Sequence, residues 1–192
     1  ATLLSTNEKE ILDVISQGRV PVVTGFQGIT ENGYFTTLGR GGSDTTASIL
    51  GVMLDAERIE IYTDVDGIMT ADPRIVKDAY LIDVISYNEV FQLADQGAKV
   101  IHPKAVEIAM EGNIPLLIKN TMSDCNGTLI NNFGDRKHKR VMSGITSQGD
   151  RIQVSITKDE NKENTKYNDI LELLAANKIS LDLINIFPDK QI

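Results

Sequence analysis

Two kinds of hydrophobic spacing alternate along the first two thirds of the chain. Ile11, Leu12 and Ile15 recur at helical spacing, whereas the β-branched run from Val20 to Phe26 is typical of a strand. By the same criteria, further helices are expected near residues 43–55, 86–97 and 103–112, and further strands near residues 57–64 and 114–120. This alternation predicts an α/β fold, with a mainly parallel sheet that helices cover on both faces.

Short local motifs predict where several of these elements turn, begin or end. The Asn32-Gly33 pair is a strong hairpin signal. Ser86 and Glu89 have the spacing of a capping box, so a helix is expected to begin there. Pro103 suits the first turn of the next helix.

The pattern changes after a short basic segment over residues 135–140. Residues 150–157 alternate as in a strand, residues 165–178 form an amphipathic helical pattern, and residues 179–187 return to a strand. The order strand, helix, strand indicates one further βαβ unit.

These shifts divide the chain into three parts. We expect a first domain over residues 1–134, a linker over residues 135–140, and an incomplete second domain over residues 141–192. The linker is interpreted as a solvated connector rather than a nucleic-acid patch, because its basic run is short.

Composition narrows the classes of partner. With 192 residues and 41% hydrophobic side chains, the chain is long enough to bury a core, and its net charge of -8 argues against general attraction to nucleic acid or anionic lipid. Cys125 is the sole cysteine, which excludes an intrachain disulfide and fits a reducing compartment. No apolar run approaches the ~20 residues that span a bilayer. We therefore expect a cytoplasmic protein that binds neither nucleic acid nor membrane.

The stretch "GRGGSD" places a fixed positive charge and two glycines directly before an expected helix. Gly41 and Gly42 allow backbone N–H groups to converge at the helix N-terminus, where anions bind. Arg40 adds a planar fork suited to a carboxylate or phosphate. Ser43 is expected to cap the helix, and Asp44 suits its positive end. The alternative is an ordinary capped helix after a glycine turn.

A second group of polar residues follows the expected strand over residues 57–64. The string "YTDVDGIMTADPR" brings together Thr63, Asp64, Asp66, Asp72 and Arg74. Ligands of open α/β sheets bind at such strand ends. An acidic surface loop is the alternative, whereas a calcium loop is excluded because no glutamate closes it.

Two more candidates lie between expected helices, in "QGAKVIHP". Lys99 and His102 are each more often surface residues than catalytic ones. We interpret His102, which precedes Pro103, as structural.

Four segments together carry a family resemblance: "PVVTGFQG", "TTLGRGGSDTTA", "IYTDVDGIMTADPR" and "GAKVIHP". In this order and spacing they resemble the later part of the catalytic domain of aspartokinases, in the amino-acid kinase family. The likeness covers residues 21–130. The unit from residue 141 resembles the start of the ACT-type, ferredoxin-like regulatory region.

The resemblance implies transfer of the ATP γ-phosphate to the side-chain carboxylate of L-aspartate, giving 4-phospho-L-aspartate, with Mg²⁺ as cofactor. This is the first step toward lysine, threonine, methionine and diaminopimelate. An ionised carboxylate needs no general base, so the protein must mainly hold two anions together and offset charge on the phosphoryl group. That chemistry agrees with a site of cations and N–H donors.

The resemblance also implies roles for single residues. Arg40 matches the arginine that holds the substrate carboxylate, and Gly41, Gly42 and Ser43 line the same pocket. Asp44 matches an acidic residue that organises the phosphates, their magnesium or nearby basic groups. The positions implied for the nucleotide are Thr63, Asp64, Met69, Thr70, Ala71, Asp72, Pro73, Arg74 and Lys99. Of these, Arg74 suits phosphate, and Lys99 suits the nucleotide or the transferring group. The candidate catalytic residues are therefore Arg40, Asp44 and Lys99. The magnesium ligands are not assigned.

Two features depart from the family pattern. Met69 stands where aspartokinases commonly have tyrosine, which removes a polar or aromatic contact to the nucleotide. The family's amino-terminal Lys-Phe-Gly-Gly segment, with its phosphate-facing lysine, is not in these 192 residues. We therefore expect this stretch alone to be an inefficient kinase.

The second domain is the candidate regulatory part. Ser180, Leu181, Asp182 and Asn185 match the strand region where an ACT unit binds an amino-acid effector such as lysine, threonine or diaminopimelate. The alternative is that they are ordinary sheet residues. Pairing of ACT units implies a homo-oligomer.

Two rival functions remain open. One is another amino-acid kinase that uses a different carboxylate or carbamate acceptor. The other is a non-catalytic effector-binding or assembly subunit.

Overall fold

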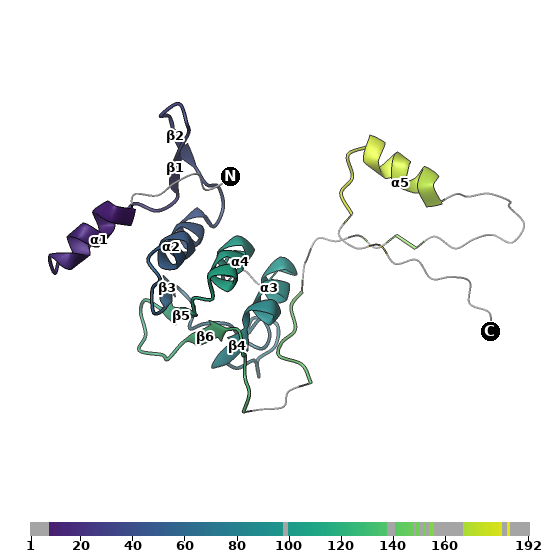
Figure 1. Cartoon of the computed structure of the whole chain (residues 1–192). Helices are drawn as coiled ribbons and strands as arrows, with labels where there is room; N and C mark the ends of the chain where they lie inside the picture. Colours follow the sequence, from purple (N-terminus) through teal and green to yellow (C-terminus); the bar gives the residue numbers. More distant parts are fainter. Residues whose placement is uncertain are drawn as a thin grey trace, which may run out of the picture. The chain divides into compact units, whose positions relative to one another are not determined.

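The computed structural model describes residues 8–97, 100–137, 141–147, 149, 152, 154–155, 167–181 and 184 (Figure 1). The chain divides into two compact units, residues 1–149 and residues 150–192. Each unit is described by itself below.

A four-stranded sheet forms the centre of the first unit. Its strands are β3 (Ile59–Thr63), β5 (Leu116–Asn120), β6 (Thr128–Asn131) and β4 (Val84–Ser86), in the order β3-β5-β6-β4. The β3-β5 and β4-β6 pairings are parallel, as predicted, but β5 and β6 are antiparallel. The connection of residues 121–127 is too short for the crossover that a parallel pair requires. The sheet is therefore mixed, although mainly parallel.

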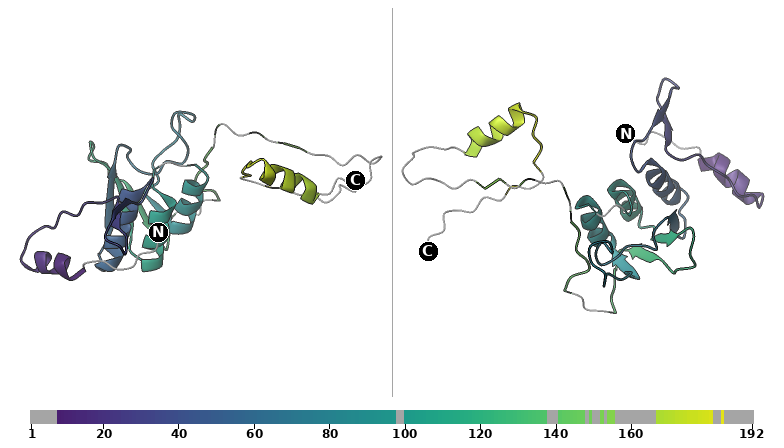
Figure 2. Two further views of the ribbon diagram at one scale, coloured as in Figure 1. Left: turned by 90° about the horizontal axis from the view of Figure 1, so that it is seen from above. Right: turned by 180° about the vertical axis from the view of Figure 1, so that it is seen from behind.

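Three helices cover one face of this sheet: α2 (Gly42–Met53), α3 (Tyr87–Asp95) and α4 (Pro103–Gly112). They lie next to one another in Figures 1 and 2, with α4 between α2 and α3. Alternate strand residues point into the shared core, among them Ile59, Ile61, Leu116, Ile118 and Ile130. The intervening residues of β3 and β5 are partly buried or, in the case of Tyr62, exposed, and no described helix of this unit covers that face. The expectation of helices on both faces is therefore wrong for the described part of this unit.

Helix packing depends on a small residue where α2 meets α4. A Cβ atom added at Gly112 would lie 2.4 Å from Cγ2 of Val52, so only glycine permits this approach. On the α3 side, the fully buried Tyr87 donates a hydrogen bond to the carbonyl oxygen of Ile114 at 2.7 Å. Burial raises the pKa of the Tyr87 phenol to about 12.

The predicted starts of α3 and α4 are confirmed. Ser86 is the N-cap of α3 and forms a complete capping box with Glu89. Pro103 is the first residue of α4, and the His102 side chain accepts a hydrogen bond from the backbone N–H of Lys104 as its N-cap. The structural interpretation of His102 agrees with this contact.

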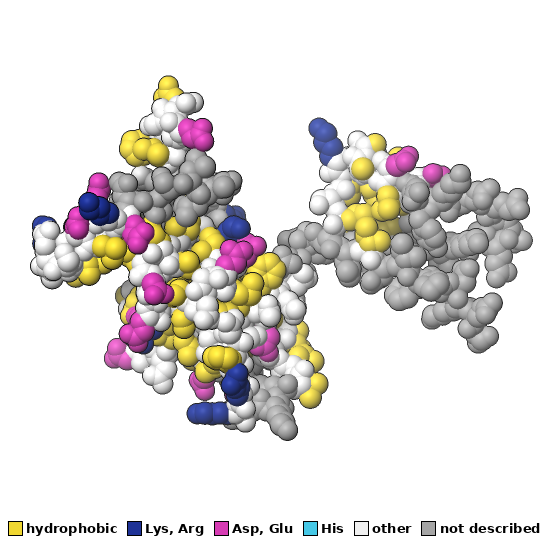
Figure 3. Space-filling view, viewed as in Figure 1, with side chains coloured by type: hydrophobic (Ala, Val, Ile, Leu, Met, Phe, Trp, Pro, Cys, Tyr) yellow, Lys and Arg dark blue, Asp and Glu magenta, His cyan; other side chains and the backbone are white. Residues whose placement is uncertain are grey.

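A helix and a hairpin precede the sheet. Helix α1 (Glu8–Ser16) lies within the first helical pattern. Strands β1 (Gln27–Ile29) and β2 (Phe35–Thr37) pair antiparallel around the predicted turn at Asn32-Gly33. Figure 3 shows hydrophobic side chains exposed on this hairpin; Phe35 is 81% exposed.

The strand expected from Val20 to Phe26 is not formed. Val20 and Val22 are 86% and 96% exposed, and no described strand lies beside this run to share ladder hydrogen bonds. Phe26 itself has a φ of 69°, which ends the extended conformation. A β-branched composition alone therefore misled the prediction.

The described part of the second unit contains helix α5 (Tyr167–Ala176), which lies within the predicted helical pattern. No strand is assigned to the described residues of the two expected strands, which are residues 152, 154–155, 179–181 and 184. The ACT-type arrangement stays a prediction. None of the helices in the described residues is both long and apolar enough to cross a membrane.

Candidate functional site

A glycine turn builds the N-terminus of α2. Gly41 is the N-cap with a φ of 69°, and no described side chain caps the helix. Ser43 was expected to be the cap, but it lies two residues after the N-cap, as the second residue of the helix, because Gly41 holds the N-cap position. The Gly42 N–H donates to the Gly39 carbonyl oxygen at 3.1 Å, whereas no side-chain hydrogen bond caps the helix in the described part of the chain. The backbone N–H groups that follow in the first turn are therefore candidates for binding an anion.

The glycines let this turn pack closely between two other segments. A Cβ at Gly41 would lie 2.3 Å from Cγ of His102, and one at Gly42 would lie 2.7 Å from Cδ2 of Phe26. The Phe26 N–H donates to Oγ1 of Thr46 at 3.1 Å. The turn thus meets the end of the "VVTGF" run on one side and the start of α4 on the other.

Charged groups flank this turn. Arg40 is exposed and forms no ion pair with any residue in the described part of the chain. Asp44 is half-buried in the first turn of α2, and its Oδ2 accepts from the His102 backbone N–H at 3.4 Å. Gly42 is buried and Ser43 is exposed. Residues 40–44 therefore lie together at the start of α2, with the side chains of Arg40 and Ser43 exposed to solvent.

The carboxyl end of β3 holds the next predicted residues. Thr63 ends the strand, and its hydroxyl donates to Asp64 at 3.2 Å. Thr63 is paired in register with Asn120, the last residue of the parallel strand β5, so both strands end at the same edge. Asp66, in contrast, accepts hydrogen bonds from the side chains of Asn120 and Ser123, and these bonds hold the pKa of its carboxyl group below the usual range. Asp66 therefore fixes the loop rather than offering a free carboxylate.

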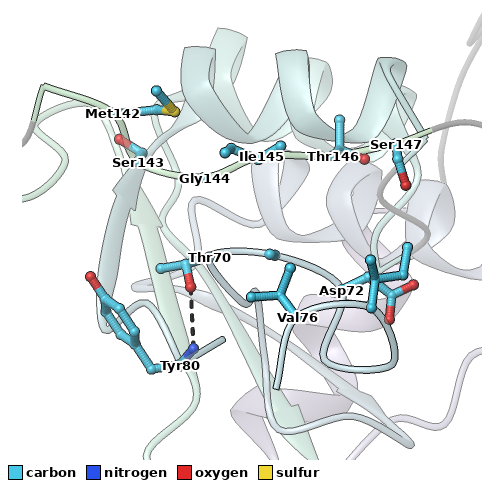
Figure 4. A pocket seen from close by; sticks show the side chains of 12 residues that line it. Thr70, Asp72, Val76, Tyr80, Met142, Ser143, Gly144, Ile145, Thr146 and Ser147 are labelled. Carbon is cyan, nitrogen blue, oxygen red and sulfur yellow. Dashed lines mark hydrogen bonds between the residues drawn. The ribbon is translucent and has the colours of Figure 1, made fainter. Parts of the chain in front are cut away.

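A pocket of about 350 Å³ lies beside the loop that follows β3 (Figure 4). Of the positions implied for the nucleotide, Thr70, Ala71 and Asp72 line this pocket, whereas Met69, Pro73 and Arg74 do not contribute to its lining. The remaining lining residues were not predicted: Ile75, Val76, Tyr80 and the six residues 142–147. Figure 4 shows Met142 to Ser147 as an extended segment on one side, opposite Thr70, Val76 and Tyr80.

The loop from Thr70 to Tyr80, which forms the other side of the pocket, is held by hydrogen bonds across its base. Thr70 N–H donates to the Tyr80 carbonyl at 2.9 Å, and Tyr80 N–H donates to Oγ1 of Thr70 at 3.2 Å. Met69 and Leu81 form an isolated bridge just outside them. Met69 therefore lies at the base of this loop and not in the pocket lining.

Arg74 lies just outside the pocket and is paired with its neighbour Asp72. The guanidinium Nη2 approaches Oδ2 of Asp72 at 2.7 Å, and the Arg74 backbone N–H donates to Oδ1 at 2.9 Å. These hydrogen bonds keep the pKa of Asp72 below its ordinary value. Because the Arg74 side chain is 88% exposed, its other donors remain accessible to an anion.

Some predicted residues are not tested. Lys99, Asp182 and Asn185 lie outside the described residues, while Ser180 and Leu181 are exposed after α5. Within the described ranges, no cluster of three or more histidine, cysteine, aspartate or glutamate side chains could hold a metal ion.

Parallel strands that end at one edge, a glycine turn at the N-terminus of α2 and a pocket beside the loop after β3 define a protein of the α/β class with a candidate ligand site. The chain belongs to the amino-acid kinase family, whose family model matches residues 1–120.

Relatives and solved structures agree with the resemblance to aspartokinases. Aspartokinase 1 of Bacillus subtilis (strain 168) is 40% identical over 99% of this chain and 48% of its own length. The structure of E. coli aspartokinase III in complex with aspartate and ADP covers 93% of this chain and 40% of its own, at 31% identity and a TM-score of 0.63. The same enzyme with lysine and aspartate covers 65% of this chain and 28% of its own, at 42% identity and a TM-score of 0.58. This chain thus spans about half the length of the curated relatives it matches.

Proposed function

We propose that the complete product of the reading frame encoding this sequence, hereafter the complete product, is an aspartate kinase. It transfers the γ-phosphate of ATP to the side-chain carboxylate of L-aspartate and yields 4-phospho-L-aspartate, the first step toward lysine, threonine, methionine and diaminopimelate. The observation that carries this proposal is the exposed Arg40 beside an uncapped glycine turn at the start of α2.

Arg40 is proposed to hold a carboxylate of L-aspartate through its planar fork. The turn at Gly41 and Gly42 is proposed to line the same pocket, with the backbone N–H and hydroxyl of the exposed Ser43 as donors to the ligand. Their support is geometric: His102 and Phe26 pack against the two glycines, and Arg40 and Ser43 on either side of them are exposed. Because the attacking carboxylate is already ionised, these groups only need to bind and orient it.

The pocket beside Thr70 to Asp72 is proposed to take the nucleotide, with Thr63 and Asp64 at the strand end and Met69, Pro73 and Arg74 shaping or flanking it. Its volume of about 350 Å³ falls in the range of small-molecule sites. Arg74 is suited to phosphate because part of its fork remains accessible beside Asp72. Lys99 is proposed to contact the nucleotide or the transferring group.

The described residues are compatible with Mg²⁺ bound mainly by the nucleotide. Magnesium in such sites usually takes one or two protein carboxylates and several phosphate oxygens or waters, so a cluster of three acidic residues is not required. Asp44 is the carboxylate that we propose near the ion, because it lies in the first turn of α2, next to the residues proposed to hold L-aspartate. When bound, the ion would offset negative charge on the phosphates.

The second unit is proposed to be the start of an ACT-type regulatory region. Ser180, Leu181, Asp182 and Asn185 are the candidate contacts for lysine, threonine or diaminopimelate, and pairing of such units would give a homo-oligomer. We also propose a cytoplasmic location.

A hydroxamate assay for acyl phosphate tests the activity. The complete product is incubated with ATP, Mg²⁺, hydroxylamine and one acceptor at a time, and the 192-residue chain is assayed in parallel. Colour with L-aspartate but not L-glutamate is expected for the complete product. Colour with glutamate alone would favour the other amino-acid kinase, and no colour with any acceptor would favour an assembly or effector-binding subunit.

A further inference from the structure

The pocket wall formed by Met142 to Ser147 has no counterpart among the predicted nucleotide positions. It supplies half of the twelve residues that line the pocket and runs opposite Thr70, Val76 and Tyr80 in Figure 4. In sequence it comes shortly before Asp150, where the second unit begins. We call this segment, residues 142–147, the upper wall.

Three hydrogen bonds fasten the upper wall to the first unit. The Ile145 N–H donates to the Thr70 carbonyl oxygen at 2.8 Å and so ties the two sides of the pocket together. The Ser143 hydroxyl donates to Oε1 of Glu89. The Thr146 hydroxyl approaches the Gln96 carbonyl oxygen at 3.4 Å. Glu89 and Gln96 belong to α3 and its C-cap, so this helix supports the wall along its length.

Glu89 binds the wall with an oxygen that its helix cap does not use. Its Oε2 accepts from the backbone N–H of Ser86 at 2.9 Å and from the Ser86 hydroxyl, which completes the capping box. Its Oε1 is left for Ser143. Partial burial opposes ionisation and Asp135 repels the charge, but the hydrogen bonds from Ser143 and Ser86 together keep the pKa of Glu89 below its ordinary value.

The lining favours the nucleoside part of a nucleotide over its phosphates. Ala71, Ile75, Val76, Met142 and Ile145 present apolar surface, and the twelve described lining residues include no lysine or arginine. A flat base is bound by such apolar surfaces, whereas phosphates require cations or clustered N–H donors. Phosphate groups would instead extend toward Arg74, outside the pocket.

We propose that the upper wall closes the nucleoside end of the nucleotide site and that Glu89, acting through Ser143, is the positioning residue that holds this wall in place. The inference rests on the proposed nucleotide site but goes beyond the family positions, none of which lies in residues 142–147. Because the wall forms one side of the proposed nucleotide site, a displacement of the wall changes the affinity for the nucleotide.

Binding of ADP to the complete product, measured by calorimetry, tests the proposal with three variants. Ser143→Ala removes the hydroxyl that reaches Glu89 and is expected to weaken ADP binding about three- to tenfold, the effect of one ordinary hydrogen bond, because the lost contact acts on the nucleotide only through the wall. Ser143→Thr keeps the hydroxyl and is expected to bind within about twofold of the unchanged protein. Ser86→Ala is the matched control, because it removes the other serine hydroxyl on the same carboxylate while leaving Ser143 in place.

Thermal unfolding separates the two functions of Glu89. Ser86→Ala is expected to lower the melting temperature through loss of the α3 cap and to leave ADP affinity within about twofold. Equal ADP affinity for Ser143→Ala, Ser143→Thr and the unchanged protein would overturn the role of the wall while leaving the proposed function intact. Absence of ADP binding to the unchanged protein would instead overturn the nucleotide site, and this inference with it.

Discussion

Replacement of Arg40 by alanine is the most direct test of the substrate site. The side chain is exposed and has no ion pair within the described residues, so its loss should change the free energy of unfolding by less than about 0.5 kcal/mol. A hydrogen bond to a charged group contributes about 1.5–3 kcal/mol, and 1.4 kcal/mol corresponds to tenfold in affinity. The KM for L-aspartate is therefore expected to rise about 10- to 150-fold.

The hydroxamate assay of the complete product measures this effect, with aspartate varied at saturating ATP. Arg40→Lys keeps the charge but not the fork, so an intermediate KM is expected. Arg58→Ala is the matched control: Arg58 is also a partly exposed arginine, 52% exposed, but it pairs with Glu60 at the opposite end of β3 from Thr63. If Arg40→Ala and Arg58→Ala both leave the KM for aspartate unchanged, the assignment of Arg40 to the carboxylate is wrong.

Three further predictions concern the scaffold around the sites. Gly41→Ala is expected to lower the free energy of unfolding by at least about 1 kcal/mol in a urea titration, because the added Cβ meets His102 and the left-handed conformation disfavours alanine; an unchanged midpoint would contradict the close packing. Tyr87→Phe is expected to cost about 1–3 kcal/mol in the same assay, since the buried carbonyl of Ile114 loses its donor; a neutral result would show that this carbonyl finds another partner. The pKa of Glu89 is lowered in the folded state, so its contribution to stability is present above the unfolded-state pKa near 4.5 and is lost as the pH falls through the folded value. Urea midpoints measured from pH 7 to pH 3 should therefore fall less steeply for Glu89→Gln than for the unchanged protein, and identical slopes would refute the assignment.

Local signals predicted those parts of the fold that depend on local chemistry. The capping box of Ser86 and Glu89, the proline start of α4 and the Asn32-Gly33 turn all lie where their spacing indicated. Each depends on hydrogen bonds or dihedral angles within a few residues, so the sequence alone contains the necessary information.

The failures concern features set by distant parts of the chain. The run from Val20 to Phe26 has the composition of a strand, but a strand also needs a neighbour, and none is present among the described residues. Ser43 has the chemistry of an N-cap, but the left-handed Gly41 takes that position because it must fit against His102, sixty-one residues later in the sequence. Residue preferences therefore identified the segment where the helix begins but not the residue that forms its N-cap.

The upper wall shows why half of the pocket lining could not be read from the sequence. Ser143 and Ile145 match no motif, and their partners Glu89 and Thr70 are separated from them by more than fifty residues. Glu89 was predicted only as the acceptor of its own helix cap, and such a cap uses one carboxylate oxygen. The second oxygen remains available to any donor that the fold brings near, and here that donor belongs to the segment leading to the second unit. The Glu89 carboxylate, which completes the local cap of α3, thus also holds the distant upper wall through Ser143. This second contact determines, in our proposal, whether the pocket is closed on one side.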